Sequence, residues 1–451
     1  MRSLLEEAAK RAVGYLEGLT KRDVAPTGEA VARLAEFDGA LPSAPQAPGD
    51  TLRQLDELAS PATMANAGGR FFGFVTGGAL PVTVASNWLA TAWDQNAAHH
   101  TPAPAAAALE RTALRWLLAL LGLPASSGGA FVTGATMANF SALAAARHAV
   151  LEHVGWHVEA DGLFGAPPIT VLVGEEAHPT LMKSLGMLGL GRSRVLRVPV
   201  DGQGRMRADR LPAWSGPCIV CMQAGNVNTG AFDPFAAIID EAHAHGAWVH
   251  VDGAFGLWAA ASAALAPLAA GMERADSWAT DAHKWLNVPY DSGLAFVRDA
   301  GALRSAMAIS ADYLPTQSES RNPSDYTPEL SRRARGVDVW AALRTLGASG
   351  VAEMLERCCR HARRFASELR SAGCTVLNEV VLNQVLVSFG DADTTRRVIA
   401  ELQADGTCWC GPTQWQGHTA MRISVCSWAT TDEDVSRSLD AMLRIAARCR
   451  G

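Results

Sequence analysis

Short apolar runs alternate with helix-like segments through the middle of the chain, and this alternation limits the possible folds more than any other feature. A short apolar run predicts a buried strand, and apolar residues at helical spacing predict a helix. Strands that alternate with helices form a mostly parallel sheet with helices on both faces, so we expect an α/β fold. The expected strands are 130–133, 169–173, 195–200, 218–222, 248–251 and 294–297, and the expected helices are 106–121, 137–150 and 235–245.

The two ends of the chain carry different patterns. Residues 1–19 repeat apolar side chains at helical spacing, and a proline-rich stretch follows them at 41–48. Beyond Gly347 we expect a smaller α+β domain, with a long helix over 351–371, separated strands near 385–389 and 422–425, and a last helix over 431–449. The expected parts are an N-terminal helical arm over 1–80, a large α/β domain over 81–345 and a small C-terminal α+β domain over 346–451.

Charge and cysteine content exclude several classes of protein. The chain has 39 Lys+Arg against 45 Asp+Glu, a net charge of −6, a pI near 6.1 and no basic stripe, so we expect no nucleic-acid partner. Its nine cysteines are odd in number and irregularly spaced, which is typical of reduced thiols in the cytoplasm. Cys218 and Cys221 form a CxxC, but it lies within an apolar run and has no second pair. A core strand is therefore favoured there, and no metal site is expected.

Two uncharged stretches, 71–93 and 253–272, are long enough to span a bilayer. Glycine, proline and polar residues interrupt both, so we interpret them as buried segments and expect no membrane partner. The glutamates of the first helix, Glu6, Glu7 and Glu17, argue against a secretory signal peptide.

Lysine is scarce in this chain. Only four of the 39 cations are lysine, and one of them lies in Asp281-Ala-His-Lys-Trp285. An arginine stays protonated and cannot act as an amine nucleophile, whereas a desolvated lysine can. A solvated surface position is the alternative for every lysine, and it suits Lys10, Lys21 and Lys183 better than Lys284.

Three other segments place polar groups just after expected strands, at the edge of a parallel sheet where ligands bind. Thr133-Gly-Ala-Thr-Met-Ala-Asn139 opens a helix, so its free amides suit a phosphate, although small residues also simply cap helices. Asp252 ends an apolar strand, where a carboxylate either needs a positive or hydrogen-bonding partner or caps the next turn. His178 lies in a loop just past a strand, where a solvated histidine is the common alternative.

Together the four segments fit pyridoxal phosphate (PLP). This cofactor needs a lysine for its aldehyde carbon, a carboxylate to keep its pyridine nitrogen protonated, a helix N-terminus for its phosphate and a flat group stacked on its ring. The chain supplies the phosphate turn, then a histidine, then an aspartate, then a lysine about thirty residues further on. We therefore expect PLP as the cofactor.

With these motifs, the chain resembles the group II PLP-dependent amino-acid decarboxylases, the family of the aromatic amino-acid, glutamate and diaminobutyrate decarboxylases. The resemblance implies the fold of the PLP-dependent transferases, fold type I. It also implies a homodimer with active sites at the subunit interface, in which the N-terminal arm packs on the partner subunit. It runs from about Arg70 to the C-terminus and is carried by Arg70-Phe-Phe-Gly73, Pro104-Ala with Leu109-Glu110, Ala177-His178, His250-Val-Asp-Gly-Ala254, His283-Lys-Trp285 and Arg422-Ile-Ser424.

The resemblance also implies roles for individual residues. Lys284 would form the internal aldimine, Asp252 would pair with the pyridine nitrogen, and His178 would stack on the ring. Tyr313 would reprotonate the quinonoid carbon after CO2 leaves. The other cofactor-binding residues would be Ala135, Thr136, Asn226, Ala254, Asp281 and His283, and the substrate-binding residues would be Phe74, His99, His100 and Arg422.

The implied function is decarboxylation of an L-amino acid to an amine and CO2. Gly225-Asn-Val-Asn228 stands where many relatives have Gly-Thr-Thr, and Phe74-Val-Thr-Gly77 lacks the aromatic-Pro-Thr pattern of the aromatic-substrate enzymes. A polar or acidic substrate side chain is therefore as consistent with the chain as an aromatic one. Two alternatives keep the cofactor, namely an aldehyde synthase or carbon–carbon lyase and a non-catalytic PLP-binding dimer. A structural ion pair is the alternative for Arg422.

Overall fold

A computed structural model describes residues 1–309 and 321–450. They form two compact units, each made of more than one stretch of chain. One unit consists of Ala79–Arg360 and Asn378–Gln384, and the other of Met1–Gly78, His361–Leu377 and Val385–Gly451. The separate N-terminal arm that the sequence predicts, packed on a partner subunit, stays a prediction. Within the single chain the first 78 residues belong to the same unit as the C-terminal segments.

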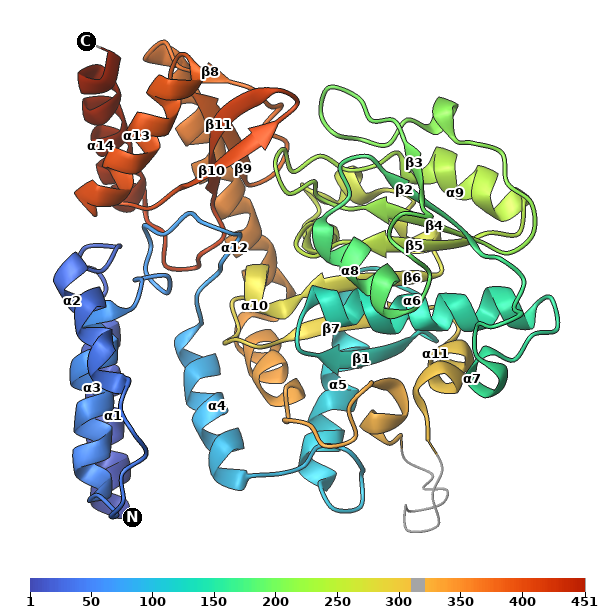
Figure 1. Ribbon diagram of the computed structural model, residues 1–451, viewed down its shortest axis with the longest axis horizontal. Helices are drawn as coiled ribbons and strands as arrows, with labels where there is room; N and C mark the ends of the chain where they lie inside the picture. Colours follow the sequence, from blue (N-terminus) through green and yellow to red (C-terminus); the bar gives the residue numbers. More distant parts are fainter. Residues whose placement is uncertain (310–320, 451) are drawn as a thin grey trace. The chain divides into compact units, whose positions relative to one another are not determined.

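The larger unit is built on a sheet of seven strands in the order β1-β7-β6-β5-β4-β2-β3 (Figure 1). Strand β7 runs antiparallel to both of its neighbours, and the other pairs are parallel. The mostly parallel sheet of an α/β fold is thus confirmed. The strands are β1 (Gly128–Val132), β2 (Thr170–Gly174), β3 (Leu196–Val198), β4 (Cys218–Gln223), β5 (Trp248–Asp252), β6 (Ser277–Asp281) and β7 (Gly293–Val297).

Helices flank this sheet. The alanine-rich helix α6 lies across β1, β7, β6 and β5 (Figure 1), and its Ala138, Ala142 and Ala145 are fully buried. Small side chains let its backbone approach the sheet closely, which brings its N-terminus to the sheet edge where β5 and β6 end. The helices of this unit are α4 (Pro81–Trp93), α5 (Pro104–Leu120), α6 (Ala135–Glu152), α7 (Val158–Asp161), α8 (Pro179–Met187), α9 (Phe235–Ala244), α10 (Ala282–Trp285) and α11 (Ala300–Met307).

Helix α12 (Gly336–Ser371) begins in the larger unit and ends in the smaller one. Gly347, with φ 59° and ψ 179°, interrupts its helical backbone. The helix expected over 351–371 is confirmed as the second of two helices that meet at this kink, and the sequence analysis missed the first one.

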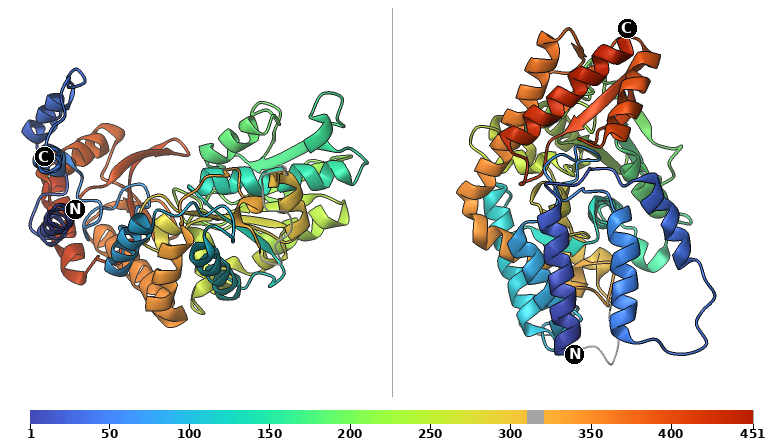
Figure 2. Two further views of the ribbon diagram at one scale, coloured as in Figure 1. Left: turned by 90° about the horizontal axis from the view of Figure 1, so that it is seen from below. Right: turned by 90° about the vertical axis from the view of Figure 1, so that its left-hand side faces the viewer.

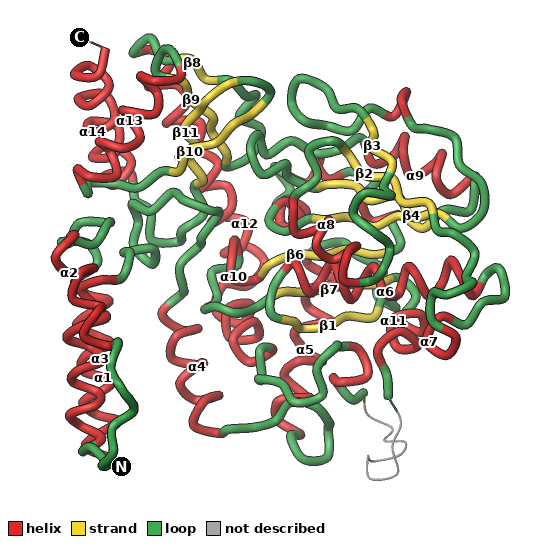
Figure 3. The backbone as a smooth tube through the Cα atoms, viewed as in Figure 1, coloured by secondary structure: helices red, strands yellow, loops and turns green. Residues whose placement is uncertain are grey.

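The smaller unit carries a second sheet of four strands in the order β10-β11-β9-β8 (Figures 2 and 3). Arg70, which is buried, donates to the carbonyl oxygens of Thr407 and Arg22 and so ties distant segments of this unit together. The helices and strands of the smaller unit are α1 (Arg2–Gly18), α2 (Gly28–Ala32), α3 (Pro48–Ala62), β8 (Thr375–Val376), β9 (Gln384–Ser388), α13 (Ala392–Asp405), β10 (Gly411–Trp415), β11 (His418–Ser424) and α14 (Asp432–Arg450).

One of the two long uncharged stretches, 71–93, is not buried throughout. None of the described helices combines the length and apolar character that crossing a bilayer requires. The stretch 71–93 was expected to be buried, but in the single chain α4 leaves Trp88, Leu89 and Trp93 exposed by 44%, 55% and 44%. The expectation was wrong for this helix, because hydrophobicity alone does not tell a core helix from one with an apolar outer face.

Candidate active site

Lys284 lies on the short helix α10, immediately after β6. Asp281 ends β6, and its Oδ2 is 2.9 Å from the Nζ of Lys284. Burial by itself would lower the pKa of Lys284, but the negative charges of Asp281 and Asp252 outweigh it and raise the pKa above its ordinary value. The amine is therefore held as an ammonium in a position that two carboxylates define.

Asp281 also connects α10 to the start of α6. Its Oδ1 accepts a hydrogen bond of 2.5 Å from the backbone N–H of Ala135, the first residue of α6. A Cβ at Gly134 would lie 3.2 Å from His283 and 3.4 Å from Asp281, and a Cβ at Gly293 would lie only 2.4 Å from the Cα of Gly134. The glycines thus let the turn before α6 lie directly against β7 and α10.

His283 is the neighbour of Lys284 and is held as a neutral ring. Burial lowers its pKa, although the charge of Asp281 opposes this. Its Nδ1 accepts the backbone N–H of Ser292 at 3.0 Å, so the ring proton lies on Nε2, which is 3.5 Å from Asp281. The ring of Tyr290 stacks on His283 with a centroid distance of 4.2 Å. The sequence analysis did not assign Tyr290, because only its place in the Pro289–Gly293 turn brings it to His283.

Asp252 ends β5, the strand beside β6, and is 4% exposed. Burial raises its pKa, and the positive charges of His178 and Lys284 partly oppose this rise. Its carboxylate accepts hydrogen bonds from the backbone N–H of Ala254 at 3.2 Å and from Nδ2 of Asn139 at 3.1 Å. Asn139 was quoted only as the end of the phosphate turn, and its spacing on α6 gave no sign of this contact.

His178 and Asp252 line one small pocket, together with Glu176 and Gln223. His178 precedes α8, and its Nδ1 accepts the backbone N–H of Thr180 at 3.3 Å as the cap of that helix. The structure thus brings together the predicted histidine and aspartate, which are far apart in the sequence.

Three further predicted residues have these places. Ala254 follows Asp252, and its carbonyl accepts the backbone N–H of Asp281 at 2.9 Å. The carbonyl of Thr136, in the first turn of α6, accepts the hydroxyl of Ser184. Asn226 is 2% exposed; its Oδ1 accepts two backbone N–H groups of its own turn, and its Nδ2 donates to Glu176 at 3.2 Å. A contact of Asn226 with the cofactor stays a prediction.

The predicted substrate residues are not gathered in the larger unit. His99 and His100 belong to it, in the connection between α4 and α5. Phe74 and Arg422 belong to the smaller unit, where Phe74 is 64% exposed beside Trp409. Arg422 lies on β11, and burial lowers its pKa. Tyr313 lies outside the described residues.

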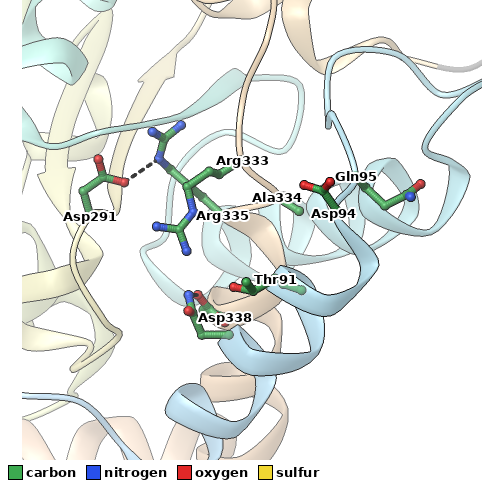
Figure 4. A pocket seen from close by; sticks show the side chains of 10 residues that line it. Thr91, Asp94, Gln95, Asp291, Arg333, Ala334, Arg335 and Asp338 are labelled. Atoms are coloured by element: carbon green, nitrogen blue, oxygen red, sulfur yellow. Dashed lines mark hydrogen bonds and ion pairs between the residues drawn. The ribbon is translucent and has the colours of Figure 1, made fainter. Parts of the chain in front are cut away.

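A separate pocket of about 460 Å³ opens beside α4 and the start of α12 (Figure 4). Both acidic and basic side chains line it, and the Nε of Arg335 is 2.9 Å from Asp291. Asp94, which follows the last residue of α4, and Asp338 on α12 both line it. None of the predicted site residues that the structure describes lines it.

The side chains at the ends of β5 and β6 fit PLP. The amine of Lys284 suits the aldehyde carbon, the buried carboxylate of Asp252 suits a protonated pyridine nitrogen, and the imidazole of His178 shares a pocket with that carboxylate. The N-terminus of α6, after Gly134, supplies backbone N–H groups and a positive helix end for a phosphate.

Comparison with known proteins agrees with this chemistry. Residues 35–390, more than half of the chain, match the family model described as the pyridoxal-dependent decarboxylase conserved domain. The chain is 26% identical to an aromatic-L-amino-acid decarboxylase of Bacillus atrophaeus, over 84% of this chain and 80% of the relative. It is 28% identical to an L-2,4-diaminobutyrate decarboxylase of Rhizobium meliloti, over 79% and 72%.

Solved structures show the same fold. The crystal structure of Oryza sativa TDC with PLP and tryptamine is similar with a TM-score of 0.90, 22% identity, and coverage of 99% of this chain and 97% of that one. The seven-stranded sheet with its flanking helices, and the small second sheet, are thus those of a PLP-dependent enzyme of fold type I.

Proposed function

The chain belongs to the family of pyridoxal-dependent decarboxylases, and from this premise we propose that it removes the α-carboxyl group of an L-amino acid as CO2 and releases the corresponding amine. PLP is its cofactor. The observation that carries the proposal is the position of Lys284. Its amine lies next to Asp281, and the negative charge of Asp252 also raises its pKa; the two aspartates end the adjacent strands β6 and β5.

Four groups of this chain would hold the cofactor. Lys284 would bind its aldehyde carbon, Asp252 its pyridine nitrogen and His178 the face of its ring, and the start of α6 would bind its phosphate. When bound, the cofactor supplies an electron sink for the electron pair that remains on the α-carbon as CO2 departs. Asp252 would stabilise the proton on the pyridine nitrogen, and its burial would protect this interaction from water.

The residues around Lys284 control whether its amine carries a proton. The amine must lose a proton before it can attack a carbonyl carbon. The carboxylate of Asp281, 2.9 Å from Nζ, raises the pKa of the amine and so favours its protonated form, whereas His283, held neutral beside it, adds no competing charge. We assign to Tyr313 the protonation of the substrate α-carbon after CO2 leaves.

The substrate class is the least constrained part of the proposal. The two curated relatives described above act on an aromatic amino acid and on L-2,4-diaminobutyrate, according to their names. We propose that the substrate carries a polar or acidic side chain, since Phe74-Val-Thr-Gly77 lacks the aromatic-Pro-Thr pattern of the aromatic-substrate enzymes. In this reading Arg422 binds a carboxylate of the substrate, and Phe74 contacts its side chain.

We also propose that the protein acts as a homodimer in the cytoplasm. The exposed apolar side chains Trp88, Leu89 and Trp93 on α4 support an interface, because large exposed apolar groups commonly mark association surfaces. Both ring nitrogens of His99 are buried and find no hydrogen-bond partner in the part of the chain that the structure describes, which is consistent with a partner subunit completing this region. The nine free and buried cysteines support a reducing compartment.

A decarboxylation screen with the holoenzyme tests the function. The panel comprises the twenty common L-amino acids, ornithine, diaminobutyrate and cysteine sulfinate, and both CO2 and amine are measured. Equal amounts of CO2 and amine from one substrate would support the proposal. Hydrogen peroxide and ammonia in amounts equal to CO2 would instead identify an aldehyde synthase.

Chemical trapping tests the site. Borohydride reduction of the holoenzyme followed by peptide mapping should attach the cofactor to Lys284. Lys284→Arg should remove the label and the activity, whereas Lys183→Arg, at an exposed position on α8, should keep both. A label on any other residue would contradict the assignment.

A further inference from the structure

A line of hydrogen bonds runs from Asp252 into the interior of the sheet. Asn139 donates from Nδ2 to Asp252 at 3.1 Å, and its Oδ1 is 2.8 Å from Nε2 of His250. The Nδ1 of His250 is 2.9 Å from Oγ of Ser277, and Ser277 in turn is 2.9 Å from Nε1 of Trp248. Asn139, His250 and Ser277 are completely buried, so water does not compete for these bonds.

Chemistry fixes the direction of this line at both ends. The indole N–H of Trp248 can only donate, and an ionised carboxylate at Asp252 can only accept. Since the oxygen of Ser277 receives the indole N–H, its own hydrogen is available for Nδ1 of His250. The ring proton of His250 then lies on Nε2 and is donated to Oδ1 of Asn139, which leaves the amide nitrogen facing Asp252.

The opposite direction is unfavourable. If His250 carried its proton on Nδ1, its Nε2 would need a donor, and the amide of Asn139 would have to turn around. Its oxygen would then face the oxygen of the Asp252 carboxylate, two acceptors without a hydrogen between them. Protonation of Asp252 would relieve this conflict, so the direction of the line and the charge of Asp252 are coupled.

The line adds a donor to Asp252 without adding a charge. Burial lowers the pKa of His250 to about 3, so its ring is neutral at physiological pH. The titratable groups that face Asp252 are His178 before α8, Lys284 on α10 and Cys221 on β4. Burial keeps the Cys221 thiol neutral by raising its pKa. The hydrogen bond from Asn139 is thus a neutral side-chain contribution that favours the ionised form of Asp252.

We propose that Asn139, His250, Ser277 and Trp248 are positioning residues that hold Asp252 ionised and oriented for the pyridine nitrogen of PLP. The inference rests on the role given to Asp252 in the proposed function. A buried carboxylate that loses a donor becomes harder to ionise, and it then competes with the cofactor for the proton that the cofactor needs.

Variants of the line test this inference through the cofactor itself. The dissociation constant of PLP is measured by titrating apo-protein, and the absorption spectrum of the bound cofactor is recorded as a function of pH. Asn139→Leu keeps about the size of residue 139 but removes its donor, and His250→Phe removes both ring nitrogens. We expect each to weaken PLP binding about tenfold or more, which corresponds to about 1.4 kcal/mol, and to move the pH midpoint of the spectral change.

Two conservative variants separate the line from a packing effect. His250→Gln places an amide N–H near the position of Nε2 and should restore PLP affinity to within about threefold of the native value. Trp248→Phe keeps an aromatic ring but removes the terminal donor, so it should move the pH midpoint while leaving the thermal unfolding midpoint of the holoenzyme nearly unchanged. A purely structural role would move the thermal midpoint instead.

Clear outcomes overturn the inference. Native PLP affinity and a native pH midpoint in both Asn139→Leu and His250→Phe would do so. If those two variants do not fold, an unchanged pH midpoint in both Trp248→Phe and Ser277→Ala would overturn it equally. Asp252→Asn distinguishes the two levels of the argument. If it binds PLP with a native spectrum, the role of Asp252 itself fails; if it does not, while the line variants are native, only the line fails.

Discussion

The Nζ of Lys284 lies 2.9 Å from Oδ2 of Asp281, which stands three residues earlier in the chain. Burial acts against this charge, but Asp281 and Asp252 together raise the pKa of Lys284. An amine reacts with an aldehyde only when it is deprotonated, so the acid–base state of this pair controls how the apo-protein captures its cofactor.

We therefore expect cofactor capture to accelerate with pH. Below the pKa of Lys284 the fraction of free amine rises about tenfold per pH unit, and because that pKa is raised, the rise continues to higher pH than for an ordinary lysine. Stopped-flow mixing of apo-protein with pyridoxal, which lacks the phosphate, measures this rate. Asp281→Asn should make capture faster at neutral pH, and Lys183→Arg should leave it unchanged. A rate that does not vary with pH would contradict the expectation.

Removing Glu110 should strongly destabilise the larger unit. Its Oε2 is 2.7 Å from Nη1 of Arg332, and the two side chains are 1% and 0% exposed. Breaking a buried pair leaves an uncompensated charge, so Glu110→Ala should lower the free energy of unfolding by about 3–5 kcal/mol. Urea denaturation measures this loss. Glu401→Ala, which breaks the exposed pair with Arg448, is the matched control and should cost at most about 1 kcal/mol. Equal losses in the two variants would refute the prediction.

Asp233 should make stability depend on pH. Burial raises its pKa from 3.8 to about 6, while the backbone N–H groups of Met206 and Gln223 that donate to it oppose the rise. The folded protein therefore keeps this proton at a pH where the unfolded chain has released it. The resulting stabilisation is complete below about pH 4 and is lost as the pH rises through about 6, a change of about 3 kcal/mol.

Urea titrations at a series of pH values isolate this contribution. The difference in unfolding free energy between the native protein and Asp233→Asn should change between about pH 4 and 6 and be constant above that range. The exposed Asp393→Asn should show no comparable change. A difference that is constant over the whole range would exclude Asp233 as the source.

Gly293→Ala should damage cofactor binding. Its Cβ would lie 2.4 Å from the Cα of Gly134, and because backbone cannot move aside as a flexible side chain can, the turn that opens α6 must shift. We expect a loss of about 1–3 kcal/mol of stability, together with weaker PLP binding. Equilibrium titration of apo-protein with PLP measures the binding. Gly202→Ala, whose Cβ would meet no atom within 4 Å, is the control. Native PLP affinity in Gly293→Ala would show that the turn tolerates the displacement.

The sequence predicted the apolar strands of the large sheet but not the one strand that is rich in polar residues. Apolar runs such as 218–222 and 248–251 correspond to β4 and β5, because strands buried on both faces need continuous apolar side chains. Strand β6, Ser277–Asp281, was missed. Its serine, threonine and aspartate do not resemble a core strand, yet all its residues are buried. In this strand the polar side chains bond to the site and to their neighbours instead of to water.

For the candidate site, motif order predicted roles for Lys284, Asp252 and His178, but it did not point to the residues that contact them. The contacts of Asn139 with Asp252 and of Tyr290 with His283 depend on how α6 crosses the sheet and how the turn before β7 folds. Neither follows from spacing along the chain. The partners of an aspartate become visible only when elements distant in sequence are placed together.

The composition of the smaller unit has a consequence for biosynthesis. Its first segment, Met1–Gly78, leaves the ribosome long before the other segments of the same unit, His361–Leu377 and Val385–Gly451. At roughly 10 residues per second the delay is on the order of half a minute. During that time Phe71 lacks Trp409, on which its ring stacks in the finished protein. Nascent chains should therefore depend on chaperones at this segment, whereas most of the larger unit can begin to fold as it is made.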